Sequence, residues 1–199
     1  MSKYGGNGKE RKFGDLYETP VAVTRALLDK LRLPPSMIWE PFAGRGKVSR
    51  VLEAAGHKVV SSDIIQRDYE LDVIGDYEPL LEDIGRNVDH VISNPPYGPR
   101  NSEVPRIVKN LLSVRKRHGV IALLLPSELD FGKSKDRVAV FRDCPNFRGL
   151  IRIQDRIKWF EETMGTGTEN HCWAIWGPSD WVWDRSRHMP VIDYVRART

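Results

Sequence analysis

Apolar residues in this chain form short continuous runs that alternate with amphipathic stretches. The runs cover 37–41, 58–64, 90–94, 120–127, 147–159 and 171–177. Helical spacing is found over 47–56, 77–85, 103–119 and 136–144. Runs without polar alternation are typical of strands buried on both faces. We therefore predict an α/β fold, a doubly wound, mainly parallel Rossmann-like sheet with helices on both faces. The last two runs lack an intervening helix of normal length, so we expect an antiparallel strand pair at one edge.

The N-terminal part divides into a polar segment and a helix. Residues 1–15 are glycine-rich and basic, which predicts a flexible arm; a terminus without a role is the alternative. Residues 19–31 have helical spacing, with Thr19 expected as the N-cap and Pro20 at the first helical position. Residues 16–199 are predicted to form one domain, with no segment long enough for a separate target-recognition domain.

Composition narrows the class of protein without naming a partner. Of 199 residues, 40% are hydrophobic and 29% charged, as in ordinary globular proteins. No apolar run approaches the roughly 20 residues that span a bilayer, so we expect a cytoplasmic protein without a membrane partner. Cys144 and Cys172 lack metal-type spacing, which predicts buried thiols and no metal site. The net charge of +4 permits nucleic acid as a partner without requiring it.

A glycine-rich turn follows the first predicted strand, in the sequence EPFAGRG at 40–46. Gly44 and Gly46 allow a tight turn and close approach of a ligand. Asp63 ends the next strand, nineteen positions after Gly44, where a carboxylate can accept hydrogen bonds from ribose hydroxyls. Ser49 replaces the third glycine of the dinucleotide-binding pattern, which weakens a nicotinamide assignment.

Two further acidic residues are candidates for the same site. Glu40 beside the turn would repel a pyrophosphate but attract the amino or sulfonium group of S-adenosylmethionine; a satisfied strand-end carboxylate is the alternative. Asp72 could accept a hydrogen bond from an adenine amino group, and a solvated turn aspartate is the alternative.

The sequence NPPY at 94–97 leaves another predicted strand at the same edge. Pro95 and Pro96 restrict the backbone, so that the Asn94 side chain and the Pro95 carbonyl can be held in place. Both oxygens could accept hydrogen bonds from an exocyclic amine and localise its lone pair toward a methyl donor. Tyr97 offers a flat face for a planar substrate. A proline-rich strand exit without chemistry is the alternative.

These motifs together resemble a known enzyme family. YETP at 17–20, EPFAGRG, SSDI at 61–64 and NPPY occur in the order seen in class I amino-group methyltransferases. They are similar to the gamma class of DNA adenine-N6 methyltransferases, and the later DRIKWF and HCWAIW resemble small phage-type members. The resemblance runs from Leu16 to Trp176, and NPPY and EPFAGRG are its most specific parts.

The resemblance implies S-adenosylmethionine as the cofactor and assigns roles to individual residues. Asn94, Pro95, Pro96 and Tyr97 would form the catalytic clamp, and Trp159 would pack on the target base, unless it is an ordinary edge-strand aromatic. The implied cofactor-binding residues are Glu18, Thr19, Glu40, Phe42, Gly44, Gly46, Asp63, Ile64 and Asp72.

The expected partner is DNA, with RNA as the alternative nucleic acid. Phosphate contacts are expected from Arg100 or Arg106, or from Arg156 and Lys158, and solvated surface charges are the alternative. The basic run VRKRHG at 114–119 is better explained as a helix-dipole complement. The recognition sequence and oligomeric state stay open.

Three other functions compete with DNA-adenine methylation. The same clamp could act on guanine in ribosomal RNA or on a protein glutamine. A non-catalytic module could retain the fold, although it would not need Asn94, Tyr97 and Glu40 together. An oxidoreductase is the least favoured, because NPPY has no part in hydride transfer.

Overall fold

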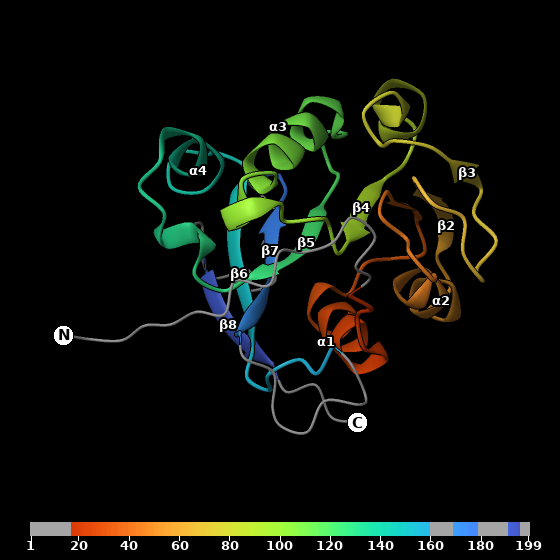
Figure 1. Ribbon diagram of the computed structural model, residues 1–199, viewed down its shortest axis with the longest axis horizontal. Helices are drawn as coiled ribbons and strands as arrows, with labels where there is room; N and C mark the ends of the chain where they lie inside the picture. Colours follow the sequence, from red (N-terminus) through yellow and green to blue (C-terminus); the bar gives the residue numbers. More distant parts are fainter. Residues whose placement is uncertain (1–16, 160–168, 179–190, 196–199) are drawn as a thin grey trace.

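An eight-stranded sheet forms the centre of the described part of the chain, residues 17–159, 169–178 and 191–195 of this computed structural model (Figure 1). Its strand order is β3-β2-β1-β4-β5-β7-β6-β8. The strands are β1 (Met37–Glu40), β2 (Lys58–Asp63), β3 (Val73–Ile74), β4 (His90–Ser93), β5 (Ile121–Pro126), β6 (Phe147–Ile153), β7 (His171–Trp176) and β8 (Val191–Val195). The arm predicted at 1–15 lies outside the described residues.

The predicted α/β fold with a mainly parallel sheet is confirmed. Among the described strands, only β7 runs antiparallel to its neighbours β5 and β6. The sequence analysis did not predict β8, which pairs in parallel with the outer side of β6 and becomes the edge strand. It also missed β3, because a strand of two residues is too short to show a period.

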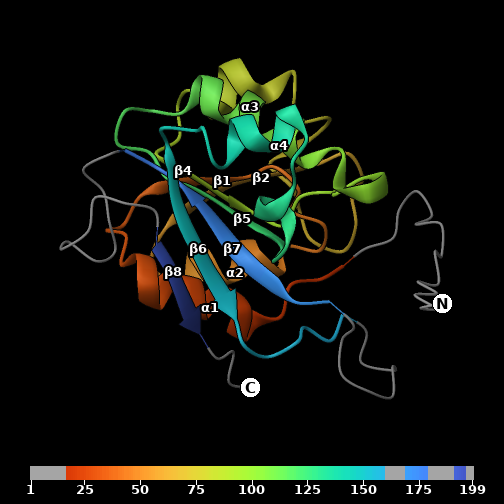
Figure 2. The same ribbon diagram turned by 90° about the vertical axis from the view of Figure 1, so that its left-hand side faces the viewer.

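Helices cover both faces of the sheet. Figure 2 shows α1 and α2 on one face, and α3 and α4 on the other. The helices are α1 (Val21–Leu31), α2 (Lys47–Ala54), α3 (Val104–Val114) and α4 (Lys135–Val140), with short turns η1 (Leu81–Gly85), η2 (Pro99–Asn101) and η3 (Leu129–Phe131). None of the helices in the described ranges is long and apolar enough to cross a membrane.

Two local predictions were wrong. Pro20, in extended conformation, occupies the N-cap position of α1, and the Thr19 hydroxyl makes no capping hydrogen bond. The helix predicted over 77–85 is shortened to the π-helical turn η1, which begins at Leu81.

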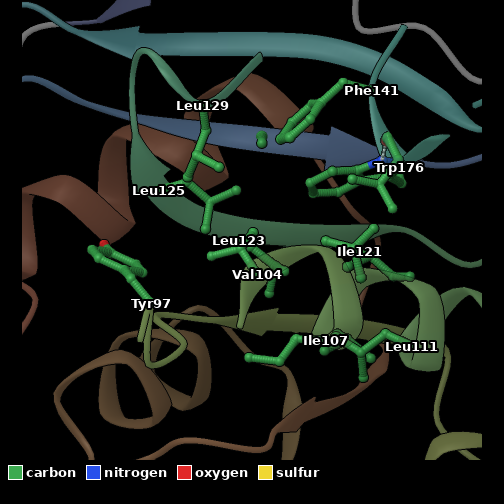
Figure 3. Close-up of a cluster of buried hydrophobic side chains, with 14 of the residues drawn as sticks. Tyr97, Val104, Ile107, Leu111, Ile121, Leu123, Leu125, Leu129, Phe141 and Trp176 are labelled. Atoms are coloured by element: carbon green, nitrogen blue, oxygen red, sulfur yellow. Dashed lines mark hydrogen bonds between the residues drawn. The ribbon is translucent and has the colours of Figure 1, made fainter. Parts of the chain in front are cut away.

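The strand β5 separates two hydrophobic clusters. Ile121, Leu123 and Leu125 face the α3 side, whereas Ala122 and Leu124 face the α1 side. Figure 3 shows the α3-side cluster, with Tyr97 at one end of it. Both faces of the strand are therefore buried, as its continuous apolar run predicted.

The two cysteines differ in burial. Cys172 is buried within the α3-side cluster, as predicted, whereas Cys144 is only half-buried. Burial raises the pKa of the Cys172 thiol to about 12, so this side chain stays protonated and unreactive at neutral pH.

Candidate functional site at the carboxyl edge of the sheet

The turn between β1 and α2 requires glycine at two positions. Gly44 and Gly46 have φ angles of 57° and 70°, in the left-handed region that L side chains rarely adopt. A Cβ atom on Gly46 would lie 2.3 Å from Cγ of Tyr69, whose ring packs over the turn. The turn therefore has no room for a side chain at the residue that precedes α2.

Asp63, the last residue of β2, binds this turn directly. Its Oδ2 accepts a hydrogen bond from the Gly44 amide at 2.9 Å, and its Oδ1 accepts one from the Ile65 amide at 3.0 Å. Nη1 of Arg67 also lies 3.5 Å from Oδ1. A carboxylate has about four acceptor positions, so these three contacts leave capacity for a further hydroxyl donor. Ile64 is 53% exposed beside it, a position suited to packing against a planar ring.

Glu40 is the most buried acidic residue at the site. Its carboxyl is 1% exposed and accepts a hydrogen bond from the Ser49 hydroxyl on α2. Burial raises the pKa of Glu40 to about 8, and the charges of Asp63 and Glu53 add to this against the opposing effect of Ser49. The group is thus mostly neutral at pH 7, and a cation placed beside it would favour its ionised form.

Asp72 and Phe42 have clear structural contacts. Oδ2 of Asp72 accepts hydrogen bonds from both the amide and the hydroxyl of Ser61, each at 2.7 Å. The Phe42 ring packs on Tyr77, with centroids 5.1 Å apart. These contacts account for the positions of both side chains without a ligand.

Residues 17–19 run along the same edge before α1 begins. The Glu18 carboxylate pairs with Nζ of Lys47, the first residue of α2, at 2.9 Å. Thr19 is 3% exposed, and its hydroxyl has no hydrogen-bond partner among the described residues. The Ser93 hydroxyl at the end of β4 is likewise buried without a described partner. Buried hydroxyls without partners are costly, so these two fit a site that a polar ligand completes.

The amide of Asn94 is oriented by two hydrogen bonds. Its Nδ2 donates to the backbone carbonyl of Tyr17 at 3.0 Å, and its Oδ1 accepts from the Tyr97 hydroxyl at 3.0 Å. A carbonyl can only accept, so the amide cannot be turned over without losing the Tyr17 bond. The Asn94 oxygen keeps a second lone pair, which can accept another donor.

A series of rings continues from this amide. The Tyr17 ring lies 5.5 Å from that of Trp159, edge to face, and Trp159 lies 5.0 Å from the ring of His171. His171 in turn lies 6.4 Å from the ring of Tyr97. Together with the hydrogen bonds of Asn94, these contacts form a closed circuit of five residues.

Sequence reasoning missed His171 and the Tyr17 carbonyl. An antiparallel strand begins where its parallel neighbours end, so His171, the first residue of β7, had to lie at the carboxyl edge. The position of His171 could therefore be inferred once β7 had been predicted antiparallel. No sequence feature indicated the Tyr17 carbonyl, because every residue has a backbone carbonyl.

The two predicted base-stacking residues differ in exposure. Tyr97 is only 6% exposed, and its hydroxyl lies 3.0 Å from both Asn94 Oδ1 and the Leu124 carbonyl, so these two acceptors share its single proton. Trp159 is half-buried and packs against the α1-side cluster. A base could therefore reach the face of Trp159 more easily than that of Tyr97 in this conformation. Of the two clamp prolines, Pro95 is buried and Pro96 exposed.

The basic residues predicted to meet phosphate fall into two groups. Arg106 forms ion pairs with Glu78 and with Glu103, so its charge is already neutralised. Arg100, Arg156 and Lys158 are exposed. The Arg100 carbonyl accepts a hydrogen bond from Arg137 at 2.7 Å, which ties the loop after Tyr97 to α4.

No model of a known protein family and no curated protein sequence matches this chain. Solved structures, in contrast, do match it. A protein assigned as a class I S-adenosylmethionine-dependent methyltransferase from Listeria monocytogenes superposes with a TM-score of 0.58 at 15% identity, covering 89% of this chain and 65% of that one. A modification subunit assigned to a type I restriction enzyme from Vibrio vulnificus gives 0.60 at 14%, covering 82% and 45%. A protein assigned as an RNA methyltransferase from Pyrococcus horikoshii gives 0.58 at 15%, covering 81% and 87%.

These likenesses establish the fold of class I methyltransferases and nothing finer, because the identities are low. The chain spans about two thirds of the Listeria protein and less than half of the Vibrio subunit.

Proposed function

We propose that this protein is an S-adenosylmethionine-dependent methyltransferase that methylates the exocyclic N6 amine of adenine in DNA. One observation carries the proposal. The Asn94 amide is held in a fixed orientation at the edge where the glycine turn and Asp63 meet. The similar folds of a restriction-modification subunit and other methyltransferases support this choice.

The donor would occupy the edge formed by the turn and residues 17–19. Asp63 would accept hydrogen bonds from the ribose hydroxyls, and exposed Ile64 would pack on the adenine ring of the donor. The Thr19 hydroxyl would bond the methionine part, because it is buried without a described partner. Glu40 would face the positive charge of the donor, which favours its ionised form.

The chemistry needs an oriented acceptor rather than a strong base. When bound, S-adenosylmethionine supplies an electrophilic methyl carbon attached to a sulfonium. Asn94 Oδ1 and the Pro95 carbonyl would accept hydrogen bonds from the two protons of the target amine, which localises the nitrogen lone pair. That pair forms the new N–C bond, the S–C bond breaks, and sulfur retains its electrons as a thioether. The methylated nitrogen, now acidic, releases one proton to water.

Methyl transfer from labelled donor tests the proposal. The protein is incubated with donor carrying a labelled methyl group and, separately, with unmethylated duplex DNA, ribosomal RNA and a protein pool. We expect label in DNA, released as N6-methyladenine on digestion. Label found only in RNA guanine or protein glutamine would mean that the same chemistry acts on another amine. Absence of label in all three substrates would contradict the enzyme assignment.

A further inference from the structure

Three consecutive residues touch both halves of the proposed site. The Glu18 side chain binds Lys47 at the start of α2, beside the glycine turn, and the Thr19 hydroxyl is buried without a described partner. The Tyr17 carbonyl accepts the Nδ2 hydrogen bond of Asn94, and the Tyr17 ring packs on Trp159. Donor-side and acceptor-side contacts therefore lie within residues 17–19, which we name the strap.

We propose that the strap is a positioning segment that couples binding of the methyl donor to the arrangement of the target-base pocket, with Tyr17 as its key residue. The inference rests on the proposed function and adds to it an order of events, in which donor binding comes first. Donor binding fixes the strap, and the strap then fixes the Asn94 amide and the Trp159 ring that receive the base.

Geometry supports transmission through such a short segment. Neighbouring Cα atoms along the chain are 3.8 Å apart, so Tyr17 cannot shift far while Thr19 is held. The Asn94 amide depends on the Tyr17 carbonyl for its orientation, because that carbonyl accepts the hydrogen bond from Nδ2 at 3.0 Å. A displaced strap would release the amide and the edge-to-face contact with Trp159 at the same time.

The circuit of contacts explains why the acceptor side would respond as a unit. From Tyr17 it passes through Trp159 and His171 to Tyr97, and returns through Asn94. Because its members come from the strap, the loop after β6, β7 and the loop after β4, ordering one of them restricts the others. Coupling of this kind between two sites typically changes affinity by about 5- to 150-fold.

Hydrogen exchange read by mass spectrometry tests the coupling without knowledge of the acceptor. Exchange is compared with and without saturating S-adenosylhomocysteine, the demethylated product. In the wild type we expect slower exchange at 44–47, on the donor side, and about fivefold or more slowing at 155–159, which lies on the Trp159 side. In Tyr17→Ala the slowing at 44–47 should remain, and that at 155–159 should fall below about twofold.

Matched variants separate coupling from damage to the fold. Tyr17→Phe keeps the ring that packs on Trp159 and the carbonyl that bonds Asn94, so the slowing at 155–159 should remain. Val21→Ala, four residues on and 41% exposed, should also leave both effects unchanged. Lys47→Met breaks the Glu18 ion pair from the α2 side and should reduce the slowing at 155–159, so the test does not depend on one variant.

The outcomes that contradict the two proposals differ. Slowing at 44–47 without any at 155–159 in the wild type would overturn the strap and leave the proposed function intact. Undiminished slowing at 155–159 in both Tyr17→Ala and Lys47→Met would do the same. No slowing at 44–47 in the wild type would remove the donor site itself, and both proposals would fall.

Discussion

Asn94 and Glu40 are the two side chains whose local surroundings say most about the chemistry. Asn94 is oriented by the Tyr17 carbonyl and the Tyr97 hydroxyl, which gives its oxygen a defined direction. Glu40 is buried with a raised pKa of about 8, an arrangement that favours a cationic neighbour. Each feature leads to a measurable expectation.

Replacing Asn94 with Ala should reduce methyl transfer by about 100-fold or more, the usual cost of one lost oriented group that acts on the reacting atoms. The variant should still bind S-adenosylhomocysteine measurably, because the donor-side groups Asp63 and Glu40 are unchanged. Single-turnover assays and calorimetry read the two effects separately. Near-normal turnover in the variant would exclude the proposed role of the amide.

Glu40 should make the ligand-free protein less stable as the pH rises. Its folded-state pKa of about 8 lies above the ordinary 4.5, so the folded state binds more protons than the unfolded state between these values. Stability therefore falls across roughly pH 4.5 to 8. Glu40→Gln should remove this contribution, so that its gain in unfolding free energy over wild type is larger at pH 8.5 than at pH 5.5. Urea unfolding at both pH values measures the difference; an equal gain at both would contradict the shifted pKa.

Among the elements, the turn that opens α2 shows how backbone geometry and packing act together. Gly46 has positive φ and lies under the Tyr69 ring, whereas Gly56 has positive φ with open space where a side chain would be. The two positions therefore separate backbone strain from steric exclusion.

Gly46→Ala should cost more than Gly56→Ala. Backbone strain alone is worth about 1–2 kcal/mol at either position, and the clash with Tyr69 adds to it only at Gly46. Adding Tyr69→Ala should recover part of the loss at Gly46 and none at Gly56, a non-additivity that denaturant unfolding of the double mutants can measure. Equal losses at the two glycines would mean that the Tyr69 ring simply moves aside.

For the whole molecule, the remaining question is where a nucleic acid would lie. The loop after Tyr97 and the end of the loop after β6 both leave the carboxyl edge, and both carry exposed cations, Arg100 and Lys158. Arg106, although close to Arg100 in sequence, is paired with two carboxylates. Exposed cations that have no ion-pair partner among the described residues are available for phosphate binding through counterion release, and those already paired with carboxylates contribute less.

Arg100→Ala and Lys158→Ala should each weaken binding of a duplex oligonucleotide and lower the slope of log affinity against log salt by about 0.9 per phosphate contact. Arg106→Ala should leave that slope unchanged. Fluorescence anisotropy at several salt concentrations makes the comparison. A loss of affinity in Arg106→Ala equal to that in the other two variants would show that the ion pairs of Arg106 open on binding.

Apart from β3, β8 and the turn η1, the order of elements and the candidate motifs were predictable from the chain alone. Buried parallel strands appear as short apolar runs, and the glycines of the turn, Asp63 and the NPPY sequence each have local requirements that the sequence displays. The carboxyl edge as the meeting point followed from the topology, since parallel strands end on the same side.

Four properties depended on tertiary contacts and had no local signal. The pKa of Glu40 is set by burial and by Ser49 and Asp63, which only folding brings around it. Arg106 is neutralised by Glu78, 28 positions away, and the edge strand β8 is recognisable only by its pairing with β6. The orientation of Asn94 depends on a backbone carbonyl 77 positions earlier, a group that every residue carries, and only the path of the folded chain selects the one at Tyr17.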